Sequence, residues 1–318
     1  MSLIDMLQLL VSNALLYAAP LILTAIGGTF SERSGVVNIG LEGIMVIGAF
    51  SGALANFFLA PQFGSWSPWI SLIIAGLFGL IYSALHAVAT IHLRADHTIS
   101  GTVLNLAAPA LTVFLCRALT GSAQTGPLAV PFINRTLTFL SKIPLIGPIL
   151  FVNTPPVAWF SFFLALIAWL ALFKTRFGLR LRSVGESPLT AESLGINVYA
   201  MKYAGVLISG FLGGIGGAIQ SQAIANEFAV TTISGQGYMA LAAMIFGHWH
   251  PIGATLSAVF FGLAQALGYA SNYIPGLSGI PDLWLQILPY LITLVTVVFF
   301  IGKSVGPKAN GVTYVKSK

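Results

Sequence analysis

Two polar side chains lie four residues apart at the start of an apolar block. Asn38 and Glu42 belong to the glycine-punctuated run Glu32–Gly43, and on a helix this spacing places them on one face. A carboxylate inside a membrane-spanning block is costly, so its first interpretation is functional. We therefore expect Asn38 and Glu42 to line or gate a path for a polar solute. The alternative is a structural hydrogen bond, or an ion pair with Arg33.

Amide side chains form a second candidate group. Gln220 and Gln222 lie at the outer end of one apolar block, and Gln236 follows at the start of the next. An amide offers both a donor and an acceptor without a formal charge, which suits hydroxyl groups and base edges. These residues therefore extend the candidate path for a polar solute. Solvation at the outer membrane interface is the competing explanation.

The sequence lacks the motifs of an enzyme. Gly302-Lys303-Ser304 resembles the end of a P-loop, but position 297, where that motif needs glycine, is Val297. Two histidine pairs lack the spacing of a helical zinc site and are interpreted as polar loop residues: His92 with His97, and His248 with His250. With Cys116 as its single cysteine, the chain has no cysteine cluster. We expect no catalytic residue, metal or cofactor.

The elements that must position these residues are membrane helices. Of the 318 residues, 57% are hydrophobic and 7% are charged, against about 25% charged in a soluble domain. The pattern predicts an all-α polytopic membrane protein with about nine crossings (between eight and ten). The seventh is too short to cross and is expected to be a half-helix or re-entrant piece. The predicted cores are Leu9–Gly28, Val36–Leu59, Trp69–Ile91, Ile99–Cys116, Val157–Phe173, Tyr203–Ile224, Gly237–Gly247, Ile252–Ala270 and Leu283–Ile301.

The basic residues predict the orientation. Alternate loops beginning with Arg33 hold eleven of the 14 Lys and Arg residues, and the opposite loops hold Arg117, Arg135 and Lys142. This bias places the C-terminus in the cytoplasm, and it explains the net charge of +6 better than nucleic-acid binding does. We expect one transmembrane domain over residues 1–318. It would carry an outer loop of short interfacial segments (119–156), a cytoplasmic loop (174–201) and a cytoplasmic tail (303–318).

Two further patterns concern packing. Gly210, Gly213, Gly214 and Gly217 have the small-xxx-small spacing that lets a neighbouring helix approach closely. In the cytoplasmic loop, Ser187-Pro188 and Gly195 bracket a predicted short capped helix. The openings Gly35–Gly43 and Ser234–Ala242 are both small and polar, which hints at an internal repeat with corresponding broken segments.

Three ordered motifs resemble one protein family. Glu32–Gly43, Phe177–Asn197 and Ser234–Ala242 are similar to motifs of permease subunits of ABC importers for simple sugars, nucleosides and branched-chain amino acids. Asp96–Asn105 and Gly302–Gly311 resemble most the shorter permease of bacterial nucleoside importers.

The resemblance implies a type II ABC-importer fold in the bacterial cytoplasmic membrane. It implies three partners: a second, longer permease in a heterodimer, a cytoplasmic tandem ATPase and an extracytoplasmic substrate-binding lipoprotein. It adds Asn105 to the solute path, and it places ATPase coupling on Glu186, Ser187, Pro188, Ala191, Glu192 and Gly195.

Other functions stay open on the sequence alone. The same kind of permease could carry a simple sugar such as ribose or galactose. An ion-coupled secondary transporter would use membrane-embedded carboxylates, for which Glu42 and Glu227 are the internal candidates. An intramembrane enzyme has no support beyond scattered histidines.

Overall fold

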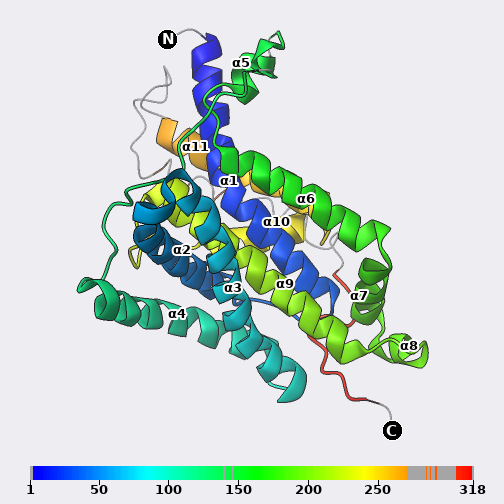
Figure 1. Ribbon diagram of the computed structural model, residues 1–318. Helices are drawn as coiled ribbons and strands as arrows, with labels where there is room; N and C mark the ends of the chain where they lie inside the picture. The colour runs from blue at the N-terminus through cyan, green and yellow to red at the C-terminus, as the bar shows by residue number, and fades with distance from the viewer. Residues whose placement is uncertain are drawn as a thin grey trace.

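The computed structural model describes residues 3–138, 140–144, 146–270 and 306–316, with the single helical positions Trp284, Ile287 and Leu291. Within these residues the chain is helical and has no strand (Figure 1), apart from an isolated bridge between Arg135 and Thr154. The helices are α1 (Leu3–Arg33), α2 (Leu41–Phe63), α3 (Ser67–Ala87), α4 (His97–Thr120), α5 (Ile146–Phe151), α6 (Pro156–Lys174), α7 (Arg176–Glu186), α8 (Pro188–Ser193), α9 (Val198–Ile219), α10 (Gln236–Phe246) and α11 (Pro251–Ala270).

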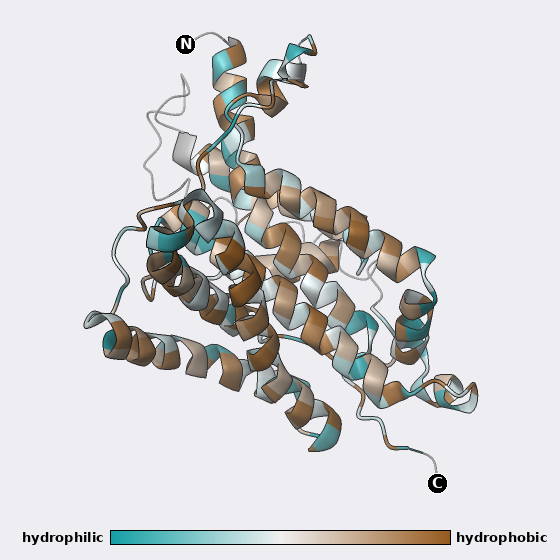
Figure 2. Cartoon of the chain, viewed as in Figure 1, coloured by the Kyte–Doolittle hydropathy of each residue, from teal (hydrophilic) through white to brown (hydrophobic). Residues whose placement is uncertain are grey.

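Length and hydropathy confirm a polytopic membrane protein. In the described part of the chain, six helical stretches are long and apolar enough to cross a membrane. One of them, Leu41–His92, contains both α2 and α3, which pack against each other. Hydrophobic residues predominate along α3 and α6 (Figure 2), as lipid-facing helices require. The predicted crossing at Leu283–Ile301 lies outside the described residues.

The packing is reciprocal between an N-terminal and a C-terminal group of helices. α1 runs antiparallel to α9: Gly205 lies against Phe30 and Ser34, and Gly216 against Pro20 and Thr24. α1 packs along α11, and in the same way α9 packs along α3 (Figure 1). The first helix of each group therefore contacts the third helix of the other.

The chain breaks between α1 and α2, where an unbroken helix over Val36–Leu59 was expected. Residues 34–40 are not helical, and Gly35 adopts φ +85°. Two of the backbone N–H groups released by the break find other partners: the Val36 N–H donates to the Ser31 carbonyl and the Val37 N–H donates to His97 Nδ1 of α4. The prediction of one helical face for Asn38 and Glu42 was therefore wrong. His97 is buried and not a solvated loop residue.

α10 confirms the predicted half-helix. Its eleven residues span about 16 Å, which is roughly half of a bilayer core. Its N-terminus meets the first turn of α2, because Gly237 lies against the backbone of Glu42. That first turn also packs beside Gly213, near the middle of the spanning stretch Val198–Ala225. The N-termini of α2 and α10 thus meet near the middle of the spanning bundle.

Polar and basic elements gather at one end of the bundle, which we call the basic end: the Arg33 end of α1, α7, α8 and residues 306–316. The expected short helix is present as α8, and Gly195 follows it at φ +77°. α7 was not anticipated; it buries Leu181 and Val184 and exposes Arg180.

The opposite end carries the loop over residues 119–156. It contains a 3₁₀ turn at Leu140–Lys142 and the short helix α5. The Ser12 hydroxyl donates to the Asn153 carbonyl at 2.7 Å, which fixes this loop to α1.

Candidate functional site

The central feature of the site is a carboxylate between two helix N-termini. Glu42 lies in the first turn of α2 and reaches across to the start of α10. Its Oε1 accepts the Gly235 N–H and its Oε2 accepts the Gly237 N–H, both at 2.6 Å. The first N–H groups of a helix have no partner within that helix, so they suit an anion. This arrangement explains how a carboxylate is tolerated near mid-membrane.

Asn105 of α4 joins the same cluster. Its Oδ1 accepts the Gly43 N–H at 2.8 Å, which caps α2. Its Nδ2 donates to the Ile39 carbonyl at 2.9 Å and to the Tyr238 hydroxyl at 3.0 Å. Three elements therefore converge through hydrogen bonds: the break before α2, α4 and α10. We call Glu42, Asn105, Gly235, Gly237 and Tyr238 the carboxylate–amide cluster.

One side of this cluster is open. Tyr238 is 49% exposed, and Glu42, Asn105 and Gln236 are each partly exposed. Within the described residues, Gln236 has one long hydrogen bond, to Gln265 at 3.4 Å, so its amide can exchange partners. A solute moving along this side would meet hydroxyl and amide groups, with the carboxylate oxygens already bound by backbone.

Asn38 lies behind the cluster and is fully buried. Its Nδ2 donates to the Ser209 hydroxyl of α9 at 2.9 Å, and its Oδ1, also buried, has no hydrogen-bond partner. In this conformation Asn38 ties the break before α2 to α9 and does not face a solute.

Gln222 belongs to a separate group nearer the opposite end. Its Oε1 accepts from Asn56 Nδ2 at 2.7 Å and from the Ser71 hydroxyl at 2.8 Å, while its buried Nε2 has no partner. Gln220, two residues earlier, is also buried, with 7% of its surface exposed. Sequence analysis overlooked Asn56 and Ser71. Their signal was a polar residue inside an apolar block, the same signal that identified Glu42.

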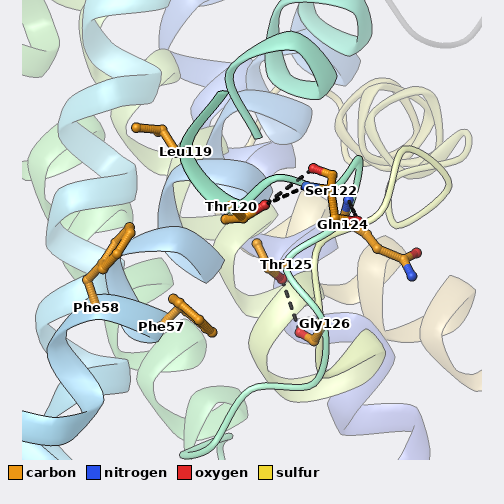
Figure 3. A pocket seen from close by; sticks show the side chains of 8 residues that line it. All are labelled: Phe57, Phe58, Leu119, Thr120, Ser122, Gln124, Thr125 and Gly126. Atoms are coloured by element: carbon orange, nitrogen blue, oxygen red, sulfur yellow. Dashed lines mark hydrogen bonds between the residues drawn. The ribbon is translucent and has the colours of Figure 1, made fainter. Parts of the chain in front are cut away.

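A shallow pocket of about 400 Å³ opens beyond this group (Figure 3). Phe57 and Phe58 of α2 form one wall, with their rings 5.4 Å apart and edge to face. Ser122, Gln124 and Thr125 of the loop after α4 form the other wall. The pocket thus offers aromatic surface on one side and polar groups on the other.

The four glycines of α9 occupy close helix contacts. A side chain at Gly214 would strike the Ala75 carbonyl of α3, and Gly48 of α2 lies against the Gly214 backbone. Gly210 faces Gly79 and Ser83 of α3, whereas Gly213 and Gly217 face Ile44 and Met45 of α2. Both neighbouring helices therefore approach α9 at backbone distance.

The residues expected to contact an ATPase lie together at the basic end. Pro188 begins α8, and Ala191 lies on the buried face of the same helix. The Ser187 hydroxyl lies 2.8 Å from that of Thr190. Glu186 is exposed, and one of its carboxylate oxygens lies 3.9 Å from Arg33 Nη1. Leu189 in α8 and Leu194 directly after it are 62% and 74% exposed.

Charge and burial shift the pKa values of two side chains at this end. Burial, with the nearby Arg33 and Arg182 guanidinium groups, lowers the pKa of His250, whose ring is tilted against that of Phe173 with centroids 4.5 Å apart. Burial and the Glu192 carboxylate raise the pKa of Tyr314 to about 12. Across the described residues, no group of three His, Cys, Asp or Glu side chains could hold a metal.

Comparison with known proteins assigns the chain to a family. Residues 10–298 match the family described as the permease component of the branched-chain amino acid transport system. The chain is 53% identical to the nucleoside ABC transporter permease protein NupC of Lactococcus lactis subsp. cremoris (strain MG1363). It is 48% identical to the guanosine ABC transporter permease protein NupQ of Bacillus subtilis (strain 168). Both alignments cover 100% of each chain.

A more distant relative is the putative glucose ABC transporter permease protein TsgC13 of Haloferax volcanii (strain ATCC 29605). It is 32% identical over 82% of this chain and 77% of its own length. The family match spans most of the helical bundle and all three motifs singled out in the sequence. The chain therefore belongs to the family of branched-chain amino acid transport system permease components.

Proposed function

We propose that this chain is a permease subunit of an ABC importer that moves nucleosides inward across the bacterial cytoplasmic membrane. The observation that carries the proposal is its full-length similarity, at 53% and 48% identity, to two permeases of nucleoside and guanosine ABC transporters. The open side of the carboxylate–amide cluster agrees with a neutral solute that is rich in hydroxyl groups.

Within this proposal the path is lined by the partly exposed side chains of the cluster, with the neighbouring Gln236: Glu42, Asn105, Gln236 and Tyr238. Asn38, Gln220 and Gln222 support its walls, because they are buried and bind or lie among neighbouring helices. Tyr238 and Gln236 offer donors and acceptors to ribose hydroxyls and base edges.

The proposed energy source is a separate ATPase docked on α8 at the basic end, which faces the cytoplasm together with the C-terminus. Exposed leucines outside the spanning segments favour a protein contact; Leu189 lies in α8 and Leu194 directly follows it. The complete transporter would comprise a second permease in a heterodimer, a tandem ATPase and an extracytoplasmic substrate-binding lipoprotein. This chain would perform no catalysis.

Uptake by the reconstituted transporter tests the substrate. The chain, co-expressed with its permease, ATPase and binding-protein partners, is placed in proteoliposomes with radiolabelled guanosine, uridine, ribose or galactose. We expect nucleoside uptake that requires ATP and survives an uncoupler. Uptake of ribose or galactose without uptake of nucleosides would show that the substrate is a sugar. Loss of uptake on addition of an uncoupler would indicate an ion-coupled transporter.

Crosslinking tests the docking surface. Leu194→Cys, beside α8, is expected to crosslink to the ATPase subunit, whereas Ser122→Cys, exposed at the opposite end, is expected to crosslink to the binding protein. Native Cys116 is buried and gives little background. The reverse pattern would overturn both the docking surface and the orientation.

A further inference from the structure

The C-terminal residues 306–316 lie across the basic end as a strap with its own hydrogen bonds. The Ala309 N–H donates to the Gly185 carbonyl of α7 at 2.9 Å. The Gly311 N–H donates to the carbonyl of Gly35, in the break before α2, at 3.4 Å. The strap therefore contacts both the helix that leads into α8 and the segment that leads to Glu42.

The first part of the strap also reaches the turn after α10. Gly306 lies against the indole of Trp249. Asn310 Nδ2 donates to Glu32 Oε2 at 2.8 Å, and the same oxygen accepts Trp249 Nε1 at 2.6 Å. Glu32 and Trp249 are buried, so this three-residue group joins the strap, α1 and α10 rigidly.

The far part of the strap is anchored under α8. Tyr314 is 8% exposed and packs with Val184, Ala191 and Val198, which come from α7, α8 and α9. Its ring meets that of Tyr199 edge to face, with centroids 5.3 Å apart. A displacement of α8 therefore acts directly on Tyr314.

Buried Lys202 of α9 binds the strap from below. Its Nζ donates to the Val312 carbonyl at 3.3 Å and to the Gly35 carbonyl at 3.5 Å. One ammonium group thus holds the strap and the break before α2 together, with only 3% of the lysine exposed.

We propose that this strap transmits movement of α8 to the carboxylate–amide cluster, through Gly35 on one side and Trp249 on the other. Tyr314 and Asn310 are its positioning residues. The inference rests on the proposed function, since it takes α8 as the ATPase contact. α7 also packs directly on α1 and α9, and α8 on α9, so the bundle has contacts that do not depend on the strap.

The experiment compares variants within the complete transporter in proteoliposomes. One variant ends after residue 305; Tyr314→Ala and Asn310→Ala are point variants, and Tyr314→Phe keeps the ring. Thr313→Ala, at an exposed position of the same strap, is the matched control. Each preparation is measured for guanosine uptake, for ATP hydrolysis with and without the binding protein, and for co-purification of the ATPase.

Uncoupling is the expected result. The truncated chain and Tyr314→Ala lose at least about tenfold in uptake, within the usual range of a coupling between sites. They retain bound ATPase and basal hydrolysis but lose stimulation by the binding protein. Asn310→Ala behaves in the same direction, whereas Tyr314→Phe and Thr313→Ala match the wild type.

Two results would overturn the proposal that the strap transmits movement. Wild-type uptake and stimulation in Tyr314→Ala would show that the strap transmits nothing. Loss of the ATPase from the Tyr314→Ala complex would show that the strap serves assembly of the transporter instead. If the truncated chain does not fold, the point variants decide. An unmodified transporter without ATP-driven nucleoside uptake would instead refute the proposed function, which keeps the two failures distinct.

Discussion

The two helix breaks near mid-membrane differ in what they contribute. The break before α2 covers residues 34–40, and the break before α10 covers residues 226–235; each contains a left-handed glycine at φ +85°, Gly35 and Gly235. The first break leads to a carboxylate, Glu42, whereas the second leads to the backbone N–H groups that donate to this carboxylate. The two halves are therefore alike in architecture and complementary in chemistry.

The helices that follow also differ. α2 continues for 23 residues to the opposite end, whereas α10 stops after eleven at a turn in which His248 and Trp249 both have positive φ. The Trp249 carbonyl accepts from Arg33 Nε at 2.8 Å, so this turn is held by α1. α2 thus runs from the carboxylate–amide cluster to the opposite end, and α10 connects that cluster to the basic end.

The largest expected effect is on helix packing. Gly214→Leu would force α9 away from α3 at Ala75, at a cost of about 3 kcal/mol, because backbone cannot yield as a side chain does. Gly262→Leu, in the other half, meets the α1 backbone at Ala14 and Ala18 just as closely and should cost a similar amount. Thermal unfolding of the purified complexes, followed by size-exclusion chromatography, measures both losses of stability.

Ala204→Leu is the control, because Ala204 lines an apolar surface groove on the same helix. It should leave the melting temperature unchanged. A stable, monodisperse Gly214→Leu complex would show that this face of α9 is not a close helix contact.

The next effect is on uptake and concerns the unequal chemistry of the breaks. Glu42→Ala leaves two N–H groups of α10 without an acceptor, at about 1–3 kcal/mol each. We expect uptake to fall by at least about tenfold, since 1.4 kcal/mol corresponds to a factor of ten. Glu42→Gln keeps one acceptor oxygen and should be intermediate. Initial rates of guanosine uptake give the comparison.

Gln236→Ala, in the first turn of α10, should have a smaller effect than Glu42→Ala. Among the described residues its amide has one long hydrogen bond, to Gln265. Equal losses of uptake in Glu42→Ala and Gln236→Ala would contradict the proposed difference in chemistry between the two breaks.

Two glycines with positive φ test a smaller effect. Gly195→Ala meets open space, so only backbone strain of about 1 kcal/mol opposes it. Gly35→Ala carries the same strain and in addition approaches the Ala309 carbonyl at 3.2 Å. Thermal stability should fall further for Gly35→Ala, and the reverse order would contradict the contact between the first break and the strap.

The smallest effect is a pH dependence at His250, in the turn that ends α10. Its pKa in the folded protein lies below the unfolded value of 6.5, so the unfolded chain binds more protons as the pH falls. Stability from this group is complete above pH 6.5 and is lost as the pH decreases below it. The loss of melting temperature between pH 7.5 and 5.5 should be smaller in His250→Gln than in the wild type. Parallel profiles would assign the dependence to other groups.

Sequence patterns predicted the helical class, the half-helix α10 and the short helix α8, because each depends on local composition and on proline or glycine at the ends. They failed within residues 34–40, where apolar residues suggested that the helix over Val36–Leu59 had already begun but the backbone is not yet helical. His97, sixty residues away, supplies the acceptor that allows that break. The contact between Glu42 and the N-terminus of α10 is similarly non-local, since 193 residues separate Glu42 from Gly235.

The meeting of two helix N-termini at one carboxylate also bears on ion leakage. Each N-terminus carries roughly +0.5 elementary charge, so two of them together oppose one carboxylate of about −1. The sum is close to zero at the depth where the membrane potential acts on any fixed charge. Such a site attracts neither small cations nor small anions. A transporter built around it can open to a neutral solute without short-circuiting the membrane it spans.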